Sequence, residues 1–141
     1  MKFMVDLHYH LSLFIGFNMS HERIQLGKKG EGLAARYLKQ QGYQIYAQNY
    51  FCKHGEIDII AHKDNLFAFV EVKVRNNNYC NLSEIVTYSK RHKIITTARL
   101  YLCEHNYSQD DYIIRFDIIL LEPNGTDYSI TYVPNAFTQL C

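Results

Sequence analysis

The stretch that decides the fold is GEIDIIAHKDNLFAFVEVKVR, residues 55–75. It holds two runs rich in β-branched and aromatic residues, 55–62 and 66–74, joined by the polar turn HKDN at 62–65. Such runs around a short polar turn predict two strands that pair as a β-hairpin. Within the second run, Phe67, Phe69, Glu71 and Lys73 alternate with a wholly apolar set. One face of this strand therefore changes from apolar to charged, as at a core strand whose end reaches a cleft.

The hairpin brings carboxylates together. A turn centred on 63–64 sets Glu56 opposite Glu71 with Asp58 diagonal to it, and a slip of two residues sets Asp58 directly opposite. Either register places a second carboxylate about 5–8 Å from Glu71, where like charges destabilise a sheet. A hard cation with oxygen ligands, such as Mg²⁺, would neutralise them, since Mg²⁺ often takes one or two carboxylates. Lys73 could then orient a water or meet a phosphate charge. The alternative is an edge salt bridge from Lys73 to Glu71 or Asp58.

The flanking sequence predicts further elements. Ser20 can cap a helix that runs to about Gln41 and stops at Gly42. A strand is expected at 43–51, a second helix at 83–105 capped by Asn81 or Ser83, and two strands at 112–122 and 128–133. The expected buried positions of the two helices are Leu26, Leu33, Ala34, Tyr37 and Leu38, and Ile85, Tyr88, Ile95, Ala98 and Leu102. The expectation is an α/β fold, with a central mixed sheet of about five strands flanked by helices.

Two glycines lie inside the first helix, Gly27 and Gly30. Each costs about 1 kcal/mol relative to alanine, so we expect a close approach of another part of the chain there. Glu31 follows at once, at the edge of the apolar stripe. On the fourth expected strand, Arg115 and Asp117 share one face. We interpret them as a structural ion pair that supports the sheet rather than as catalytic groups.

The composition fits one domain of 141 residues, 48% hydrophobic, with a formal net charge of +1. The four cysteines form no C-x-x-C pair, which argues against zinc and redox sites and favours free thiols in a cytoplasmic protein. No apolar run approaches the roughly 20 residues that span a bilayer, so no membrane association is expected. We interpret residues 1–18 as an N-terminal extension outside the fold, from an early start codon, and 19–141 as the domain. A secretory signal is the alternative for 1–18.

Several motifs, taken together, resemble one family. They are GKKGEGLAARYL at 27–38, GYQI at 42–45, GEIDIIA at 55–61, FVEVKVR at 69–75, RFDIILL at 115–121 and NAF at 135–137. In this order they resemble the YraN-like family of uncharacterised bacterial proteins. That family belongs to the restriction-endonuclease-like superfamily, which carries the PD-(D/E)xK nuclease motif.

The resemblance implies a nuclease-like fold and assigns roles to residues. Asp58 and Glu71 match metal ligands, Lys73 matches a catalytic lysine, and Glu31 matches an acidic position that can reach the metal or its water. Glu56, in the matching GEID, is a second-choice metal ligand. The chain departs from the pattern at Ile57, where the superfamily has proline, and at Val74, where the family has threonine. The loop 76–81 also lacks the family's usual glycine.

Basic residues near this site could contact nucleic acid. They are Arg75 at the end of the third strand and Lys90, Arg91 and Lys93 on the second helix, with Arg36 and Lys39 on the first. Such a cluster can neutralise backbone phosphates and makes binding depend on salt. The alternative is a solvated helix face. Since no helix-turn-helix or zinc finger is visible, we expect recognition of DNA shape and backbone rather than of base edges.

The leading hypothesis is a Mg²⁺- or Mn²⁺-dependent endonuclease acting on DNA, with branched or junction DNA as a candidate substrate. A resolvase would need two sites and hence a homodimer. The first alternative is a non-catalytic nucleic-acid-binding or DNA-processing accessory domain with the same fold. The second is a domain whose charged site serves a protein interface.

Overall fold

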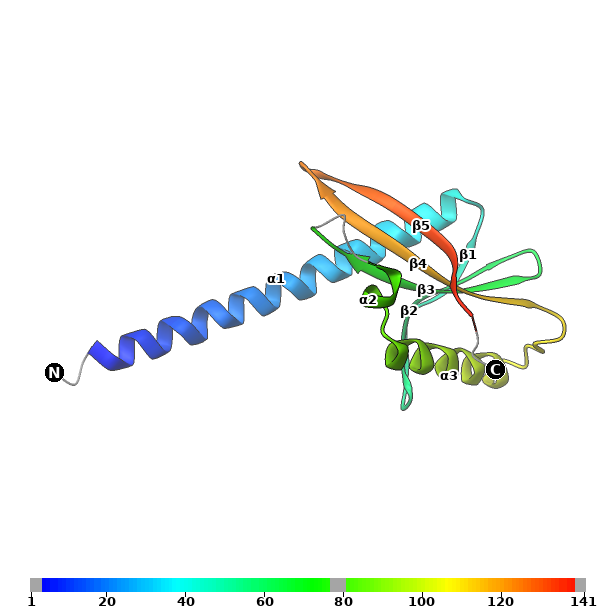
Figure 1. Cartoon of the computed structure of the whole chain (residues 1–141), viewed down its shortest axis with the longest axis horizontal. Coiled ribbons are helices and arrows are strands. Elements are labelled where there is room, and N and C mark those ends of the chain that lie inside the picture. The colour runs from blue at the N-terminus through cyan, green and yellow to red at the C-terminus, as the bar shows by residue number, and fades with distance from the viewer. Residues whose placement is uncertain (1–3, 77–80, 139–141) are drawn as a thin grey trace.

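Five strands form one mixed sheet with helices on both faces (Figure 1). The computed structural model describes residues 4–76 and 81–138, and the side chains of 21–76, 81 and 84–138. The elements in chain order are α1 (Met4–Gln40), β1 (Gln44–Cys52), β2 (Gly55–Lys63), β3 (Leu66–Val74), α2 (Leu82–Ile85), α3 (Tyr88–Glu104), β4 (Ile113–Asn124) and β5 (Asp127–Phe137). The predicted fold class, including the five strands, is confirmed.

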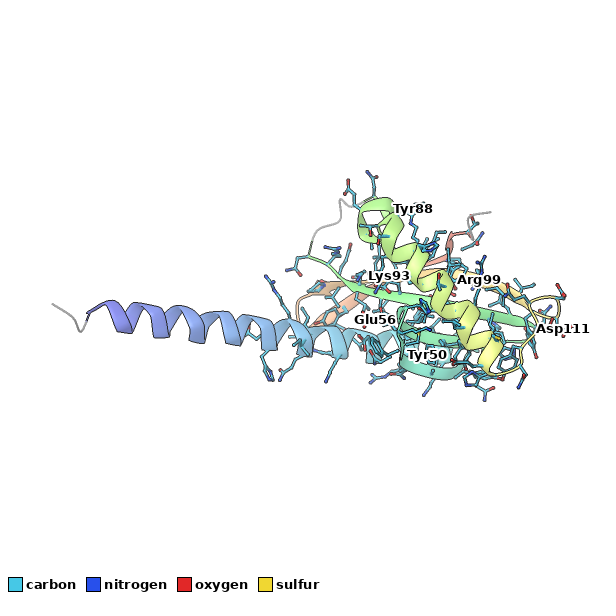
Figure 2. All side chains as sticks on the ribbon, turned by 90° about the horizontal axis from the view of Figure 1, so that it is seen from below. Tyr50, Glu56, Tyr88, Lys93, Arg99 and Asp111 are labelled. Atoms are coloured by element: carbon cyan, nitrogen blue, oxygen red, sulfur yellow. The ribbon has the colours of Figure 1, made fainter. Side chains whose placement is uncertain are left out.

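The strands lie in the order of the sequence, β1-β2-β3-β4-β5. All neighbours are antiparallel except β3 and β4, which run parallel. A parallel pair needs a crossover connection, and α2 and α3 provide it. Figure 2 looks onto the face that α3 covers, with Tyr88 at the beginning of the helix and Lys93 and Arg99 farther along it.

The sheet is buried on both faces, as the pattern of β3 predicts. Phe67 and Phe69 pack in the core under α3, whereas Ala68, Val70 and Val72 pack in the core under α1. Helix α3 contributes Ile94, Ile95, Ala98, Tyr101 and Leu102 to the first core, and α1 contributes Ala34, Ala35 and Leu38 to the second. The charged end of β3 therefore emerges between two helices.

Helix α1 begins at Met4, so the predicted start at Ser20 is wrong. Its 37 residues span about 55 Å at 1.5 Å per residue, and the first half projects away from the sheet (Figure 1). The predicted stop is confirmed, because Gly42 has φ +87°. Leu26 is exposed rather than buried. No helix within residues 4–76 and 81–138 has the length and apolar character needed to cross a membrane.

The predicted helix 83–105 is two helices, because the backbone of Thr87 is extended (φ −61°, ψ 159°). Thr87 caps α3: its hydroxyl accepts a hydrogen bond from the Lys90 amide at 3.3 Å. The break shifts the phase of the helix, so Tyr88 is 70% exposed instead of buried. Asn81, one of the two predicted caps, directly precedes α2, and its carbonyl accepts from the amides of Glu84 and Ile85. The Ser83 side chain and most of the glycine-free loop, 77–80, lie outside the described residues.

Candidate functional site

The β2–β3 hairpin takes the second of the two predicted registers. Lys63 pairs with Leu66 and Ile59 with Val70, which leaves a two-residue turn at Asp64 and Asn65. Asp64 has φ +53°, a conformation that aspartate tolerates in tight turns. This is the register in which Asp58 is expected opposite Glu71, although the paired residues of the ladder end at Ile59 and Val70.

Asp58 interrupts β2. Although Ile57 and Ile59 are two residues apart, they pack in opposite cores, so the strict alternation expected from the sequence breaks here. The β2–β3 ladder ends at Ile59, and Asp58 Oδ2 accepts a hydrogen bond from the Val72 amide at 2.7 Å. The Asp58 carboxylate thus accepts the hydrogen bond that a backbone carbonyl of β2 would accept in a regular ladder. This bond fixes its carboxylate at the edge of β3, between the two faces of the sheet.

Glu71 is a buried carboxylate without a hydrogen bond. It is 2% exposed, and neither of its oxygens has a hydrogen-bond partner among the described residues. The Lys73 ammonium lies 2.8 Å from Glu71 Oε1, close enough for an ion pair but outside hydrogen-bonding geometry. The Lys90 ammonium lies 3.5 Å from the same oxygen. Buried polar groups in proteins are nearly always hydrogen-bonded, so an exception calls for an explanation.

Asp58 has a strongly shifted pKa. Burial and, to a smaller extent, the negative charge of Glu71 raise the pKa of this carboxyl to about 7. The Val72 N–H and the Lys90 ammonium act in the opposite direction. Asp58 therefore keeps its proton to a higher pH than an ordinary aspartate does. A carboxyl poised in this way in a cleft is a recognised mark of a functional site.

An open cleft of about 510 Å³ runs along these groups. Its lining includes five predicted site residues and the predicted phosphate contact Arg75. The five are Glu31, Glu56, Asp58, Glu71 and Lys73. Arg23 and Leu26 of α1 also line it, and the sequence reading missed both. Arg23 had a signal in the sequence, because it lies eight residues, about two turns, before Glu31 on the same helix. Leu26 was expected in the buried stripe instead.

Gly30 brings α1 to this cleft. A Cβ at Gly30 would lie 2.6 Å from Val74 Cγ2 and 3.0 Å from Leu121 Cδ1, so only glycine allows the helix to approach the ends of β3 and β4 this closely. Gly27 has nothing within 4 Å of such a Cβ. The predicted close approach is thus confirmed for Gly30 and wrong for Gly27. The contact carries Glu31 to the cleft from the face opposite α3.

The basic residues of α3 separate. Lys90 reaches into the site, where its ammonium lies 3.4 Å from Glu56 Oε1. Burial alone would lower the pKa of Lys90, but the charges of Glu71, Glu56 and Asp58 raise it. Arg91 turns away: its Nε donates to the Val86 carbonyl at 2.8 Å, and its guanidinium lies over the Phe137 ring. Lys93 is exposed and outside the cleft lining.

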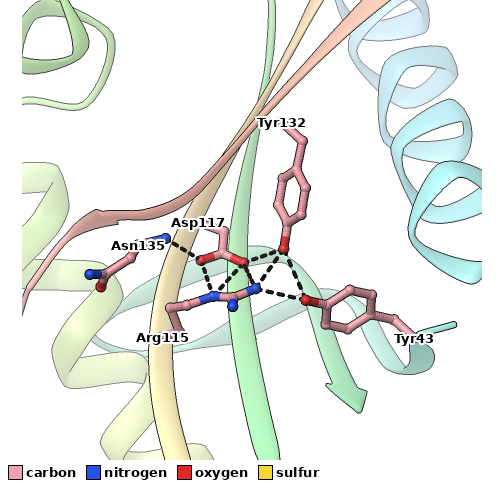
Figure 3. A network of polar contacts seen from close by, with 5 residues as sticks. All are labelled: Tyr43, Arg115, Asp117, Tyr132 and Asn135. Atoms are coloured by element: carbon pink, nitrogen blue, oxygen red, sulfur yellow. Dashed lines mark hydrogen bonds and ion pairs between the residues drawn. The ribbon is translucent and has the colours of Figure 1, made fainter. Parts of the chain in front are cut away.

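A second polar network surrounds Asp117 (Figure 3). Arg115 Nε donates to Asp117 Oδ1 at 2.8 Å, and Tyr132 donates to Oδ2 at 2.5 Å. The Asn135 amide donates to Oδ1 at 2.8 Å, and the Arg115 guanidinium also donates to the hydroxyls of Tyr43 and Tyr132. The predicted ion pair of Arg115 with Asp117 is present, and the network around it joins β4 to β5 and to Tyr43, which directly precedes β1.

The residues of the cleft fit a divalent cation in part. Two adjacent carboxylates, one of them with no hydrogen bond, are the donors that Mg²⁺ and Mn²⁺ prefer. The described residues contain no ready-made cluster of three His, Cys, Asp or Glu side chains around one point. Mg²⁺ often uses only one or two protein carboxylates and keeps several waters. Asp58 and Glu71 are the pair that meets this lower requirement.

Known proteins resemble this chain over most of its length. The profile of a family described as "Uncharacterised protein family UPF0102" matches residues 30–121. A UPF0102 protein of Clostridium perfringens is 42% identical over 115 residues, which cover 79% of this chain and 93% of the relative. One from Vibrio vulnificus is 39% identical over 118 residues, covering 83% and 95%, and one from Legionella pneumophila is 40% identical over 116 residues, covering 82% and 96%.

Proposed function

We propose, for a chain that belongs to the uncharacterised protein family UPF0102, that its cleft hydrolyses phosphodiester bonds of DNA with a divalent metal ion. The observation that carries the proposal is the buried Glu71 carboxylate, which has no hydrogen bond from any described residue and lies near a second carboxylate, that of Asp58. Burying two like charges side by side is costly unless a cation neutralises them. A site that keeps this arrangement is best explained by a ligand that completes it.

The proposed roles follow from the positions. Asp58 and Glu71 would hold Mg²⁺ or Mn²⁺, with Glu56 at the cleft edge as a further ligand. When bound, such a metal polarises a phosphoryl oxygen and lowers the pKa of a coordinated water. The Val72 N–H holds Asp58 in place, so this ligand is positioned before the metal arrives. Lys73, in contact with Glu71 and partly exposed, is placed to orient a water or to stabilise charge on the phosphate.

The outer cleft supports a nucleic-acid substrate. Arg23 and Arg75 line it beyond the carboxylates and can contact phosphates on either side of the scissile bond. Glu31 approaches from α1 and could hold the attacking water. These contacts read backbone and shape, which suits branched as well as linear DNA. Resolution of a four-way junction would further require a homodimer, and a DNA substrate would place the protein in the cytoplasm.

The test is cleavage of end-labelled linear, flapped and four-way-junction DNA by purified protein with Mg²⁺ or Mn²⁺. Glu71→Gln and Lys73→Met should each reduce the rate by at least about 100-fold, the order expected for loss of one transition-state group. Glu104→Gln is the matched control, because it removes a carboxylate charge from the exposed C-terminal end of α3 and should cut normally.

A non-catalytic DNA-binding domain is the second candidate. It is favoured by the two ammonium groups already beside Glu71, which compensate its charge without a metal. Absence of metal-dependent cutting, together with salt-sensitive DNA binding that survives Glu71→Gln and Lys73→Met, would establish this candidate instead.

A further inference from the structure

Lys90 enters the site from a different element than the carboxylates do. Its backbone lies in the first turn of α3, and its ammonium lies 3.4 Å from Glu56 Oε1 and 3.5 Å from Glu71 Oε1. It therefore links a carboxylate of β2 to one of β3. Lys73 reaches Glu71 from the same strand, two residues along. Of the two lysines, Lys90 is the one that bridges acidic groups as a metal would.

We propose that Lys90 is an internal counterion of the metal-free site, which a divalent cation must displace and which then pairs with the DNA backbone. This inference rests on the proposed function, because it assigns a metal to Glu71 and Asp58. It names a positioning residue that the motif does not include. It also accounts for the absence of a third acidic ligand close to the pair among the described residues, since an ammonium stands between Glu56 and Glu71.

The geometry allows both states. An ammonium and a divalent cation at the same carboxylate repel each other, so tight metal binding requires Lys90 to move away. Its side chain is 27% exposed and has a flexible four-carbon stem. The helix itself need not move, because the bond that caps α3 uses the backbone N–H of Lys90 and the Thr87 hydroxyl. Release of the ammonium therefore requires only a rotation of the partly exposed side chain toward solvent.

The proposal implies coupling between metal and DNA. A phosphate near the cleft offers Lys90 a new partner and draws it from Glu71, which removes one of the two ammonium groups beside that carboxylate and lowers the repulsion that the metal meets. Coupling of this kind is reciprocal, so DNA should tighten metal binding by the same factor as the metal tightens DNA binding. Without Lys90, the metal affinity should be high at the outset and respond little to DNA.

The experiment is isothermal titration calorimetry of Mn²⁺ into DNA-free full-length protein. Lys90→Met keeps the length of the side chain and removes its charge. We expect it to bind Mn²⁺ about 10-fold more tightly than wild type, a factor within the usual range of site coupling. Lys93→Met removes the same charge from the exposed side of the same helix and should bind Mn²⁺ as wild type does. A phosphorothioate duplex should tighten Mn²⁺ binding to wild type and leave Lys90→Met nearly unchanged.

The outcomes are distinct. Equal or weaker Mn²⁺ binding by Lys90→Met, with a normal circular dichroism spectrum, would overturn the inference, and Lys90→Gln serves as a second variant should Lys90→Met not fold. The expected gain in affinity without any DNA cleavage by wild type would support the inference and contradict only the hydrolysis. No Mn²⁺ binding by wild type and both Lys90 variants would overturn the inference and the metal site together.

Discussion

Two buried carboxylates on neighbouring strands, Glu71 of β3 and Asp117 of β4, are treated in opposite ways by the fold. Both are almost inaccessible, at 2% and 0% exposure. Asp117 accepts hydrogen bonds on both oxygens, from Arg115, Tyr132 and the Asn135 amide (Figure 3). Glu71 accepts none from the residues that the structure describes and has two ammonium groups near one oxygen. The same sheet can thus supply every hydrogen bond that a buried carboxylate needs. The carboxylate that lacks them, Glu71, is therefore the better candidate for binding a ligand.

The largest change in the free energy of unfolding is expected at Asp117, the carboxylate that is fully hydrogen-bonded. Asp117→Ala leaves the Arg115 guanidinium without its carboxylate in a partly buried position, and it should lower the free energy of unfolding by about 3–5 kcal/mol. Urea unfolding followed by circular dichroism measures this loss. The double variant Arg115→Met/Asp117→Leu should recover most of it. A loss under about 1 kcal/mol would show that the hydrogen bonds of Asp117 do not stabilise the fold.

The second largest effect is a dependence of stability on pH, which follows from the raised pKa of Asp58. Its folded pKa of about 7 exceeds the ordinary value of 3.8, so the folded state holds the proton that the unfolded state loses between pH 4 and 7. Stability from this group is therefore complete below pH 4 and falls as the pH rises to about 7. Between pH 5 and 7 the loss is about 2 kcal/mol at 1.36 kcal/mol per unit.

Asp58→Asn should remove this dependence, since its amide oxygen can still accept the Val72 N–H. Thermal or urea unfolding of wild type and variant at several pH values gives the comparison. The stability of the variant relative to wild type should increase from pH 5 to pH 7 and then stay level. Parallel curves over this range would show that Asp58 ionises normally.

Gly30→Ala tests how closely α1 is held against the cleft. Overpacking against Val74 and Leu121 costs about 1–3 kcal/mol, and the better helix propensity of alanine returns about 1, so a net loss of about 1 kcal/mol is expected. Gly27→Ala, which meets open space, should instead gain up to about 1 kcal/mol. Equal effects at both positions, measured by urea unfolding, would mean that the close approach does not constrain the helix.

The smallest change in stability is expected for Glu71→Gln. Lys73 and Lys90 are 32% and 27% exposed, so both can turn to water when the charge is removed, unlike Arg115. The free energy of unfolding without metal should therefore change by no more than about 1 kcal/mol, as for other functional groups that do not serve stability. The rise in melting temperature that Mn²⁺ gives wild type should vanish. A loss as large as that of Asp117→Ala would make Glu71 a structural residue.

Local patterns predict much of this molecule. Alternation along β3 predicts its two apolar faces and its charged end, and the order of elements predicts the sheet. The register of the hairpin could not be chosen from the sequence, because both turn placements leave polar residues in the loop. The break in alternation at Asp58 was not predictable either, since it depends on a bond to Val72 on the neighbouring strand.

The helical parts show the same limit. The break before Tyr88 depends on Thr87, whose capping role competes with helix continuation in a way that periodicity does not reveal. Lys90 was expected to contact DNA phosphates, with a solvated helix face as the alternative, and in the structure its ammonium lies beside Glu56 and Glu71. The sequence could therefore name the carboxylates of the site and Lys90 as a nearby basic residue, but not the position of Lys90 between Glu56 and Glu71.

The tight turn at Asp64 and Asn65 also sets an order of assembly. Asp58 and Glu71 are only 13 positions apart and meet as soon as the hairpin closes, an event of about 1–10 μs in isolated hairpins. The Asp117 network joins Tyr43 to Tyr132 across 89 positions, and contacts at such separation form late. The repulsion of the future site is thus present early in folding, where Lys73 of the same hairpin can offset part of it. The second ammonium, that of Lys90, arrives only when α3 docks. We expect this chain to reach its native state through a stage in which the acidic hairpin exists without its lysine from the helix.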